Sequence, residues 1–189
     1  MSYSAEYSDL IVRHYESCWS NKSMPHTWRE GRSGDLPAEF RVLEFRPNER
    51  RDMWTYATCC MSQPSDVLKT ELHLFSPSEE RDHVELLTVI AHYHRTGEQI
   101  GLGHSVNFGR PWFSGSACDY GLISLPYLDG PDLENLSLDD LGTGIKCLWL
   151  IPITKSEREF KKRQGVEALE SKLEDASFNY LDPARQTVV

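Results

Sequence analysis

The sequence predicts a single α+β domain over residues 1–189, with helices packed on a largely antiparallel or mixed β-sheet. The length of 189 residues fits one domain of roughly 100 to 200 residues. The hydrophobic content of 39% is sufficient for a core that needs no disulfide or metal. The apolar patterns follow the order helix, three strands, helix, several strands and helices, which is typical of an α+β fold.

The first part of the chain predicts one helix, a loop and three strands. Apolar side chains recur every three or four residues over 5–18, the spacing of one helix face. Residues 21–37 are rich in proline, glycine and polar residues and predict a loop, with Trp28 as an anchor to the core. Alternating or β-forming residues between turn signals predict strands at 40–45, 53–61 and 69–75.

The clearest helix start follows the third strand. Ser76 is the expected N-cap, Pro77 the first helical residue and Glu79 the capping-box partner. Gly97 marks the expected end of this helix. Its apolar stripe consists of Val84, Leu87, Ile90 and Ala91.

Short strands are expected within 100–108, 121–125 and 145–153. The last of these is apolar on both faces, so we expect a central strand. We also expect Leu87 and Ile90 to face Trp149 of this strand. The C-terminal segment, about 156–176, is predicted to be helical, with Ser156 and Glu159 as a second capping box.

The sequence contains no recognisable catalytic, cofactor or metal motif. His92 and His94 are two residues apart on a predicted helix and point about 200° away from each other, which disfavours a shared metal. Cys59 and Cys60 are adjacent and do not form a C-x-x-C chelate. The glycines at 101–103 stop one residue short of a dinucleotide-binding pattern. We therefore expect no catalytic residues, no cofactor and no metal.

Charge gives a stronger indication of function. The formal charge of −9 disfavours general nucleic-acid binding and favours a basic partner. Residues 111–145 contain no lysine or arginine, and this segment is either a solvated acidic loop or a docking surface for a basic protein. The candidate partner-binding residues are its six acids, Asp119, Asp129, Asp132, Glu134, Asp139 and Asp140.

The expected location is the cytoplasm. The first sixteen residues carry three acids and no apolar core of a signal peptide. The longest apolar run is far below the roughly 20 residues that a bilayer requires. Five cysteines at scattered positions fit reduced thiols better than a disulfide framework.

Several segments together resemble the suppressor-of-fused domain family. They run in family order from about 40 to 185, and one departs from the family: Cys60-Met61-Ser62 stands where many members have Gly-Met-Ser. The matching segments are Trp54–Ser62, Glu71–Leu74, Ile100–His104, Leu150–Thr154 with Glu157, and Leu181–Arg185.

The resemblance implies protein binding rather than catalysis. The single-domain form is similar to bacterial members, some of which are immunity proteins (antitoxins) that neutralise a toxin, often a nuclease. A basic toxin would also match the negative charge of this chain. Two alternatives remain open at this stage. One is a regulatory adaptor that binds a partner peptide at a sheet edge, and the weaker one is an enzyme whose Cys, His and Asp site is assembled by the fold.

Overall fold

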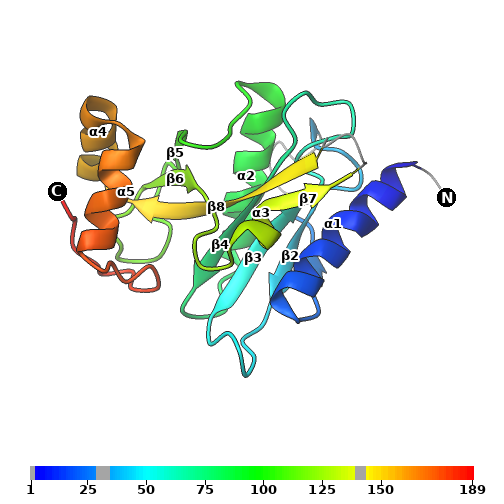
Figure 1. Ribbon diagram of the computed structural model, residues 1–189, viewed down its shortest axis with the longest axis horizontal. Coiled ribbons are helices and arrows are strands. Elements are labelled where there is room, and N and C mark those ends of the chain that lie inside the picture. The colour runs from blue at the N-terminus through cyan, green and yellow to red at the C-terminus, as the bar shows by residue number, and fades with distance from the viewer. Residues whose placement is uncertain (1–2, 29–34, 139–143) are drawn as a thin grey trace.

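A computed structural model of the chain, shown in Figure 1, describes residues 3–28, 35–138 and 144–189. Its eight named strands form one mixed sheet, in the order β1-β2-β3-β4-β8-β6-β5, with β7 also paired to β8. Every pairing is antiparallel except that of β4 with β8, which is parallel. The α+β fold with helices on a mixed, largely antiparallel sheet is therefore confirmed.

The strands are β1 (Met24–His26), β2 (Arg41–Phe45), β3 (Trp54–Cys59), β4 (Thr70–Ser76), β5 (Ser105–Asn107), β6 (Tyr120–Ser124), β7 (Asn135–Ser137) and β8 (Gly144–Ile153). The helices are α1 (Tyr3–Trp19), α2 (Asp82–Thr96), α3 (Pro131–Glu134), α4 (Lys155–Gln164) and α5 (Val166–Asp175). The predicted first helix and the predicted strands before α2 agree with α1, β2, β3 and β4 to within a few residues.

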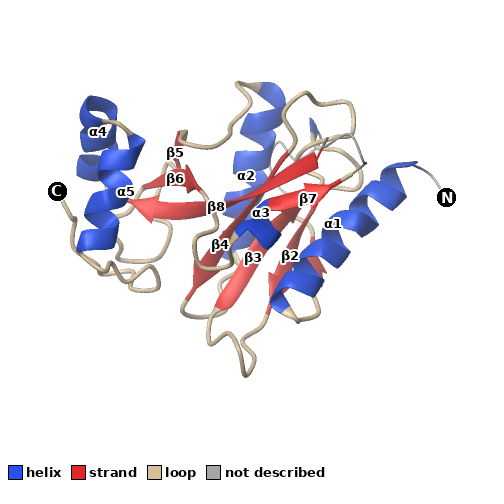
Figure 2. Ribbon diagram, in the orientation of Figure 1, coloured by secondary structure: helices blue, strands red, loops and turns tan. Residues whose placement is uncertain are grey.

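The helices cover both faces of the sheet (Figure 2). Helix α2 packs with Trp28 over one face, in a cluster that includes Leu148 and Leu150 of β8. Helix α1 covers part of the other face. Further along that face, Leu169 of α5 packs in a cluster with Trp149. Figure 1 shows α1 and α5 at opposite ends of the molecule.

Strand β8 is central, as its two apolar faces predicted, because it pairs with β4 on one side and with β6 and β7 on the other. The expectation that Leu87 and Ile90 face Trp149 is wrong. These α2 residues share a cluster with Leu148, whereas Trp149 belongs to the cluster on the α5 side. Adjacent residues of a strand point to opposite faces, so α2 meets the even-numbered side of β8.

The predicted N-terminal cap of α2 is wrong. Ser76 is the last residue of β4 and pairs with Trp54 across the ladder, and its hydroxyl donates to the Ser78 carbonyl at 2.8 Å. The helix begins at Asp82, after Arg81, and has no side-chain cap. Pairing within the sheet therefore overrides the local capping signal, while Gly97 ends the helix as predicted.

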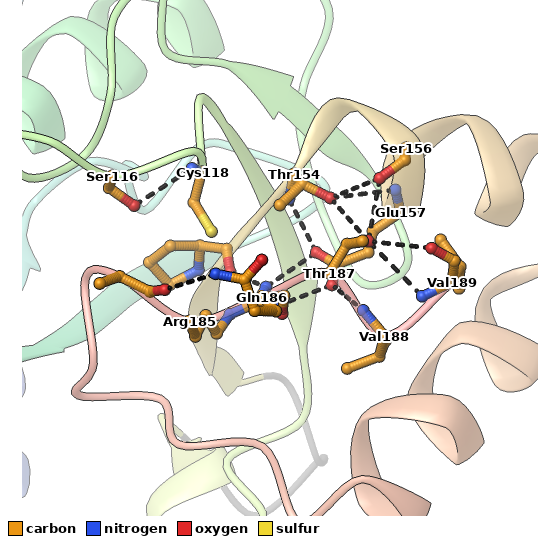
Figure 3. A network of polar contacts seen from close by, with 12 residues as sticks. Ser116, Cys118, Thr154, Ser156, Glu157, Arg185, Gln186, Thr187, Val188 and Val189 are labelled. Carbon is orange, nitrogen blue, oxygen red and sulfur yellow. Dashed lines mark hydrogen bonds and ion pairs between the residues drawn. The ribbon is translucent and has the colours of Figure 1, made fainter.

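The second capping box lies two residues earlier than predicted. Thr154, not Ser156, caps α4: its hydroxyl accepts from the Glu157 backbone N–H, and the Glu157 carboxylate accepts from the Thr154 N–H at 2.7 Å. Both four-residue patterns fit a capping box by sequence. Glu157 is fully buried and also binds Arg185 of the C-terminal segment (Figure 3), whereas Glu159 lies at the surface. The tertiary partner of Glu157 thus decides where the helix starts.

Two predicted loops contain additional structure. The three-residue strand β1 lies inside the segment 21–37 and pairs with β2. The acidic segment 111–145 contains α3 and β7 as well as the whole of β6 and the start of β8. Neither short strand shows a clear alternating pattern in the sequence, because β1 contains a proline and β7 a single apolar residue.

Candidate functional site

Two of the six predicted partner-binding acids form internal ion pairs. Asp129 pairs with Arg51, and the side chains are only 8% and 14% exposed. The Arg51 guanidinium also lies over the rings of Trp19 and Phe75, at 5.2 and 5.3 Å from their centroids. Glu134 pairs with Lys146 at 2.6 Å. These two carboxylates therefore already have cationic partners within the chain.

The other acids differ in setting. Asp132 is exposed on α3, beside Glu134. Asp119 is half-buried and directly precedes β6, so it lies on a separate element. Asp139 and Asp140 lie outside the described residues. Among the six, Asp132 is the described acid whose side chain is most open to a partner.

The structure also contains a cleft that the sequence interpretation missed. It has a volume of about 620 Å³ and lies between β8, α5, the turn at 127–128 and the segment that follows α5. We call it the aromatic cleft. Its lining consists of Tyr127, Leu128, Trp149, Ile151, Glu167, Glu170, Ser171, Leu173, Glu174, Ser177, Phe178 and Tyr180.

Rings from β8 and from the segment after α5 form the apolar part of the cleft. Trp149 and Ile151 point to the same face because they alternate along β8. The Trp149 ring packs nearly perpendicular to Tyr180, with centroids 5.4 Å apart, and stacks on Phe178 at 6.2 Å. Such ring pairs stabilise the local packing beyond burial alone.

One face of α5 supplies the acids of the cleft. Glu167, Glu170 and Glu174 follow the spacing of three and four residues that places helical side chains on one side. The Glu170 carboxylate accepts hydrogen bonds from the hydroxyls of Ser124 and, at 3.3 Å, Tyr127. Burial and the charge of Glu170 together raise the pKa of Tyr127. The cleft therefore has a negative field.

The buried histidines serve structural packing. Burial lowers the pKa of both His73 and His83 to about 3, so both are neutral near pH 7. His94 Nδ1 accepts from the Ile100 N–H at 3.1 Å, while His92 pairs with Asp35, so the two helical histidines have different partners. No group of three His, Cys, Asp or Glu residues suited to a metal ion occurs within 3–28, 35–138 and 144–189.

A cysteine and a histidine that could have formed a catalytic pair, Cys118 and His104, are not hydrogen-bonded to each other in the part of the chain that the structure describes. His104 Nδ1 faces the Gly101 N–H at 3.4 Å. Cys118 is buried, and its backbone N–H donates to Ser116. Burial raises the pKa of the Cys118 thiol, which disfavours a reactive thiolate.

The aromatic cleft was missed because its parts are spread over residues 127–180. The spacing of the three glutamates on α5 was visible in the sequence, but it does not identify the aromatic residues that face them across the cleft. None of the described helices is both long and apolar enough to cross a membrane. The fold and the cleft together define a small α+β domain with an open site suited to binding.

The chain belongs to the suppressor-of-fused family. The family model "Suppressor of fused protein (SUFU)" matches residues 37–186. A SUFU homolog from Neisseria gonorrhoeae of known crystal structure is 33% identical, with a TM-score of 0.85 and 98% of each chain covered. The family is a protein-interaction fold, which places this chain among protein-binding domains.

Two more distant structures share the fold. One is the Sufu–Fu complex, with 13% identity, a TM-score of 0.69, and coverage of 96% of this chain and 92% of the other. The other is Drosophila Suppressor of Fused, with 12% identity and a TM-score of 0.64, where the match covers 94% of this chain and 50% of the Drosophila chain. A comparison with curated protein sequences gives no significant match.

Proposed function

We propose that this chain is a non-enzymatic immunity protein (antitoxin) that neutralises a cognate, basic, nuclease-type toxin. The observation that carries the proposal is the formal charge of −9 on a chain of a protein-binding family. A nuclease must attract phosphate, so its substrate cleft is usually basic. An acidic protein can cover such a cleft, and complementary charge speeds their association.

The exposed acids of the chain would make the first contacts with this toxin. Within the acidic segment we propose Asp132 for this role, because Asp129 and Glu134 are engaged by Arg51 and Lys146. Glu167 and Glu174 on the rim of the aromatic cleft are two further acids, and no ion pair links them to a cation of the described residues.

Binding of a peptide at a sheet edge is the less favoured alternative. Edge strand β1 has Pro25 at its centre, and proline lacks the N–H that an added strand would use. At the opposite end of the strand order, β5 has three residues, and Lys161 donates to the Gly103 carbonyl just before it. The enzyme alternative has weaker support still, since the buried histidines and Cys118 lie in settings that disfavour proton transfer and nucleophilic attack.

The test is inhibition of a basic nuclease domain encoded by the neighbouring gene. We expect one equivalent of this chain to abolish nuclease activity, and the complex to weaken as salt rises. Asp132→Lys should slow association, whereas Glu98→Lys, which reverses an exposed acid just beyond α2, should slow it less. Circular dichroism of each variant checks that the fold is retained.

Two other results would change the proposal. A neighbouring nuclease that stays fully active with excess chain at low salt would contradict the immunity function. Inhibition without salt dependence would retain the immunity role but assign it to an apolar surface.

A further inference from the structure

The aromatic cleft exposes apolar surface that the fold does not use. Tyr127 is 59% exposed and Leu128 is 48% exposed, although most large apolar side chains of the chain are buried. Both residues line the cleft beside the buried Trp149. An exposed apolar patch with a polar rim is typical of an interaction site, and Trp and Tyr are enriched among the residues that dominate binding.

The lining of the cleft carries charge of only one sign. Three glutamates line it, and no lysine, arginine or histidine of the described residues does. Lys172 of the same helix lines a different surface pocket, near Arg163 and the C-terminal residues. Glu170 is held by Ser124 and Tyr127, which leaves Glu167 and Glu174 as the rim carboxylates open to a ligand.

The spacing of these two carboxylates restricts the shape of a ligand. Glu167 and Glu174 are seven residues apart on α5, which corresponds to about 10 Å along the helix axis at 1.5 Å per residue. A peptide in the extended polyproline II conformation rises about 3.1 Å per residue with three residues per turn, so residues three apart lie about 9 Å apart on the same side. Two cationic side chains three residues apart would therefore match the two carboxylates, with the intervening residues above the apolar floor.

We propose that the aromatic cleft binds a short, extended, basic segment of a protein partner. One large apolar side chain of the segment inserts between Trp149 and Leu128, and a lysine or arginine on each side pairs with Glu167 and Glu174. The pattern is a cation, an apolar residue, any residue and a second cation. This inference rests on the proposed function, for which it names the contacting site. The volume of about 620 Å³ accommodates such an anchor, since well-formed ligand sites measure roughly 300–1,000 Å³.

The experiment uses the full chain and a synthetic eight-residue peptide that contains Lys-Leu-Ser-Lys between glycine and serine residues. Binding is followed in low salt by the NMR signal of the Trp149 indole N–H, assigned with Trp149→Phe. We expect saturable binding with a Kd below about 1 mM, equivalent to roughly −4 kcal/mol. Peptides that contain Lys-Ser-Ser-Lys or Glu-Leu-Ser-Glu should each bind at least tenfold more weakly.

Two variants test the location. Ser171 is exposed on the cleft side of α5, so Ser171→Trp fills the cleft without altering the core and should weaken binding at least tenfold. The double variant Glu167→Lys with Glu174→Lys should do the same. The matched control is Glu6→Lys with Asp9→Lys, which reverses two exposed acids on α1 at the other end of the molecule and should change affinity less than twofold. Thermal melts check the fold of each variant.

Four outcomes would overturn the inference. Absence of binding at 1 mM peptide, or unchanged binding by Ser171→Trp, would exclude the cleft. Equal weakening by both acid pairs would indicate attraction to net charge alone. A dimer of the wild type that Ser171→Trp dissociates would make a second copy the occupant. Two further results separate this inference from the proposed function. If the Ser171→Trp variant still inhibits the nuclease, the immunity function stands without the cleft. If the wild type binds the peptide but does not inhibit the nuclease, the cleft stands as a binding site without the immunity function.

Discussion

Arg185 and Glu157 form a two-pronged ion pair inside the protein (Figure 3). The two guanidinium nitrogens of Arg185 lie 2.7 and 2.8 Å from the two carboxylate oxygens of Glu157, and one of them also donates to the Pro152 carbonyl. The carboxylate further accepts from the backbone N–H groups of Thr154 and Val188. This pair therefore joins the end of β8, the start of α4 and the C-terminal segment.

Removing the charge of Glu157 should strongly destabilise the fold. Glu157→Gln leaves the Arg185 guanidinium, whose side chain is 7% exposed, without its counter-charge. Loss of one partner of a buried ion pair costs about 3 to 5 kcal/mol in the free energy of unfolding. Urea denaturation at pH 7 measures the change. Glu98→Gln, on an exposed acid, serves as the control, and an equal effect of both variants would contradict the prediction.

The Glu157–Arg185 pair should also make the stability of the fold depend on pH in the acidic range. Burial acts to raise the pKa of Glu157, but hydrogen bonds from Arg185 and from backbone N–H groups outweigh it, so the pKa is lowered. Its stabilising contribution is therefore present above the ordinary glutamate pKa of 4.5 and is lost as the pH falls through the lowered value. Wild type should lose stability below about pH 4 more steeply than Glu157→Gln. Parallel curves would show that Glu157 does not cause the loss.

The segments that resemble the family contact one another and stabilise the fold. The Leu181–Arg185 segment meets the Leu150–Thr154 segment and Glu157 through the Arg185 ion pair. Cys60, at the position where many family members have glycine, has φ of +66°, in the left-handed region that glycine adopts most easily. The sequence thus predicted the fold through residues that hold it together. It did not predict the cleft, whose residues interact only after distant segments pack.

Local patterns failed where sheet or tertiary contacts compete with them. Ser76 has an N-cap residue type followed by proline, but pairing with β3 keeps it in a strand. The acidic segment reads as uniformly charged, yet Arg51, nearly eighty residues before Asp129, neutralises one of its members. Pairings between residues far apart in the chain leave no periodic signal in a single sequence.

Glu71 should make the stability of the fold depend on pH with a sign opposite to that of Glu157. Burial raises its pKa to about 7, even though the Thr58 hydroxyl and the backbone N–H groups of Met61 and Ser62 donate to the carboxylate. Its contribution to stability is fully present below the ordinary pKa of 4.5 and is lost as the pH rises through about 7. Between pH 5 and 8, wild type should lose stability relative to Glu71→Gln.

The comparison with Glu71→Gln isolates this one group, because the other ionisable groups are the same in both proteins. At pH 5, Glu71→Gln should cost about 1 to 3 kcal/mol, since an amide NH₂ would replace one of two oxygens that accept backbone N–H groups. Urea denaturation at a series of pH values measures both effects. A constant difference between the two proteins would place the pKa of Glu71 outside this range.

The two sides of β8 should respond independently to substitution. Trp149→Ala should cost about 3 to 5 kcal/mol and Ile90→Ala about 2 to 5, because both side chains are buried. They belong to clusters on opposite faces of the sheet, so the double variant should equal the sum within about 0.5 kcal/mol. Denaturant melts of the four proteins measure this. A coupling above about 1 kcal/mol would show that the faces communicate through β8.

The acids of the segment 111–145 should separate into structural and available groups. Asp129→Asn leaves the Arg51 side chain, which is 14% exposed, without its ion pair and should cost about 3 kcal/mol. Asp132→Asn, three residues later on the exposed side of α3, should change the free energy of unfolding by less than about 0.5 kcal/mol. Both substitutions remove one negative charge, so net charge does not distinguish them.

Urea denaturation of these two variants, followed by circular dichroism, gives the comparison. Similar stabilities would mean that the Arg51–Asp129 pair contributes little to the fold and that Asp129 is available to a partner. The predicted difference would instead assign Asp129 to the fold. Charge reversal at Asp129 would then combine loss of stability with any loss of docking. Asp132 is consequently the position at which the effect of charge on toxin association can be measured in an intact protein.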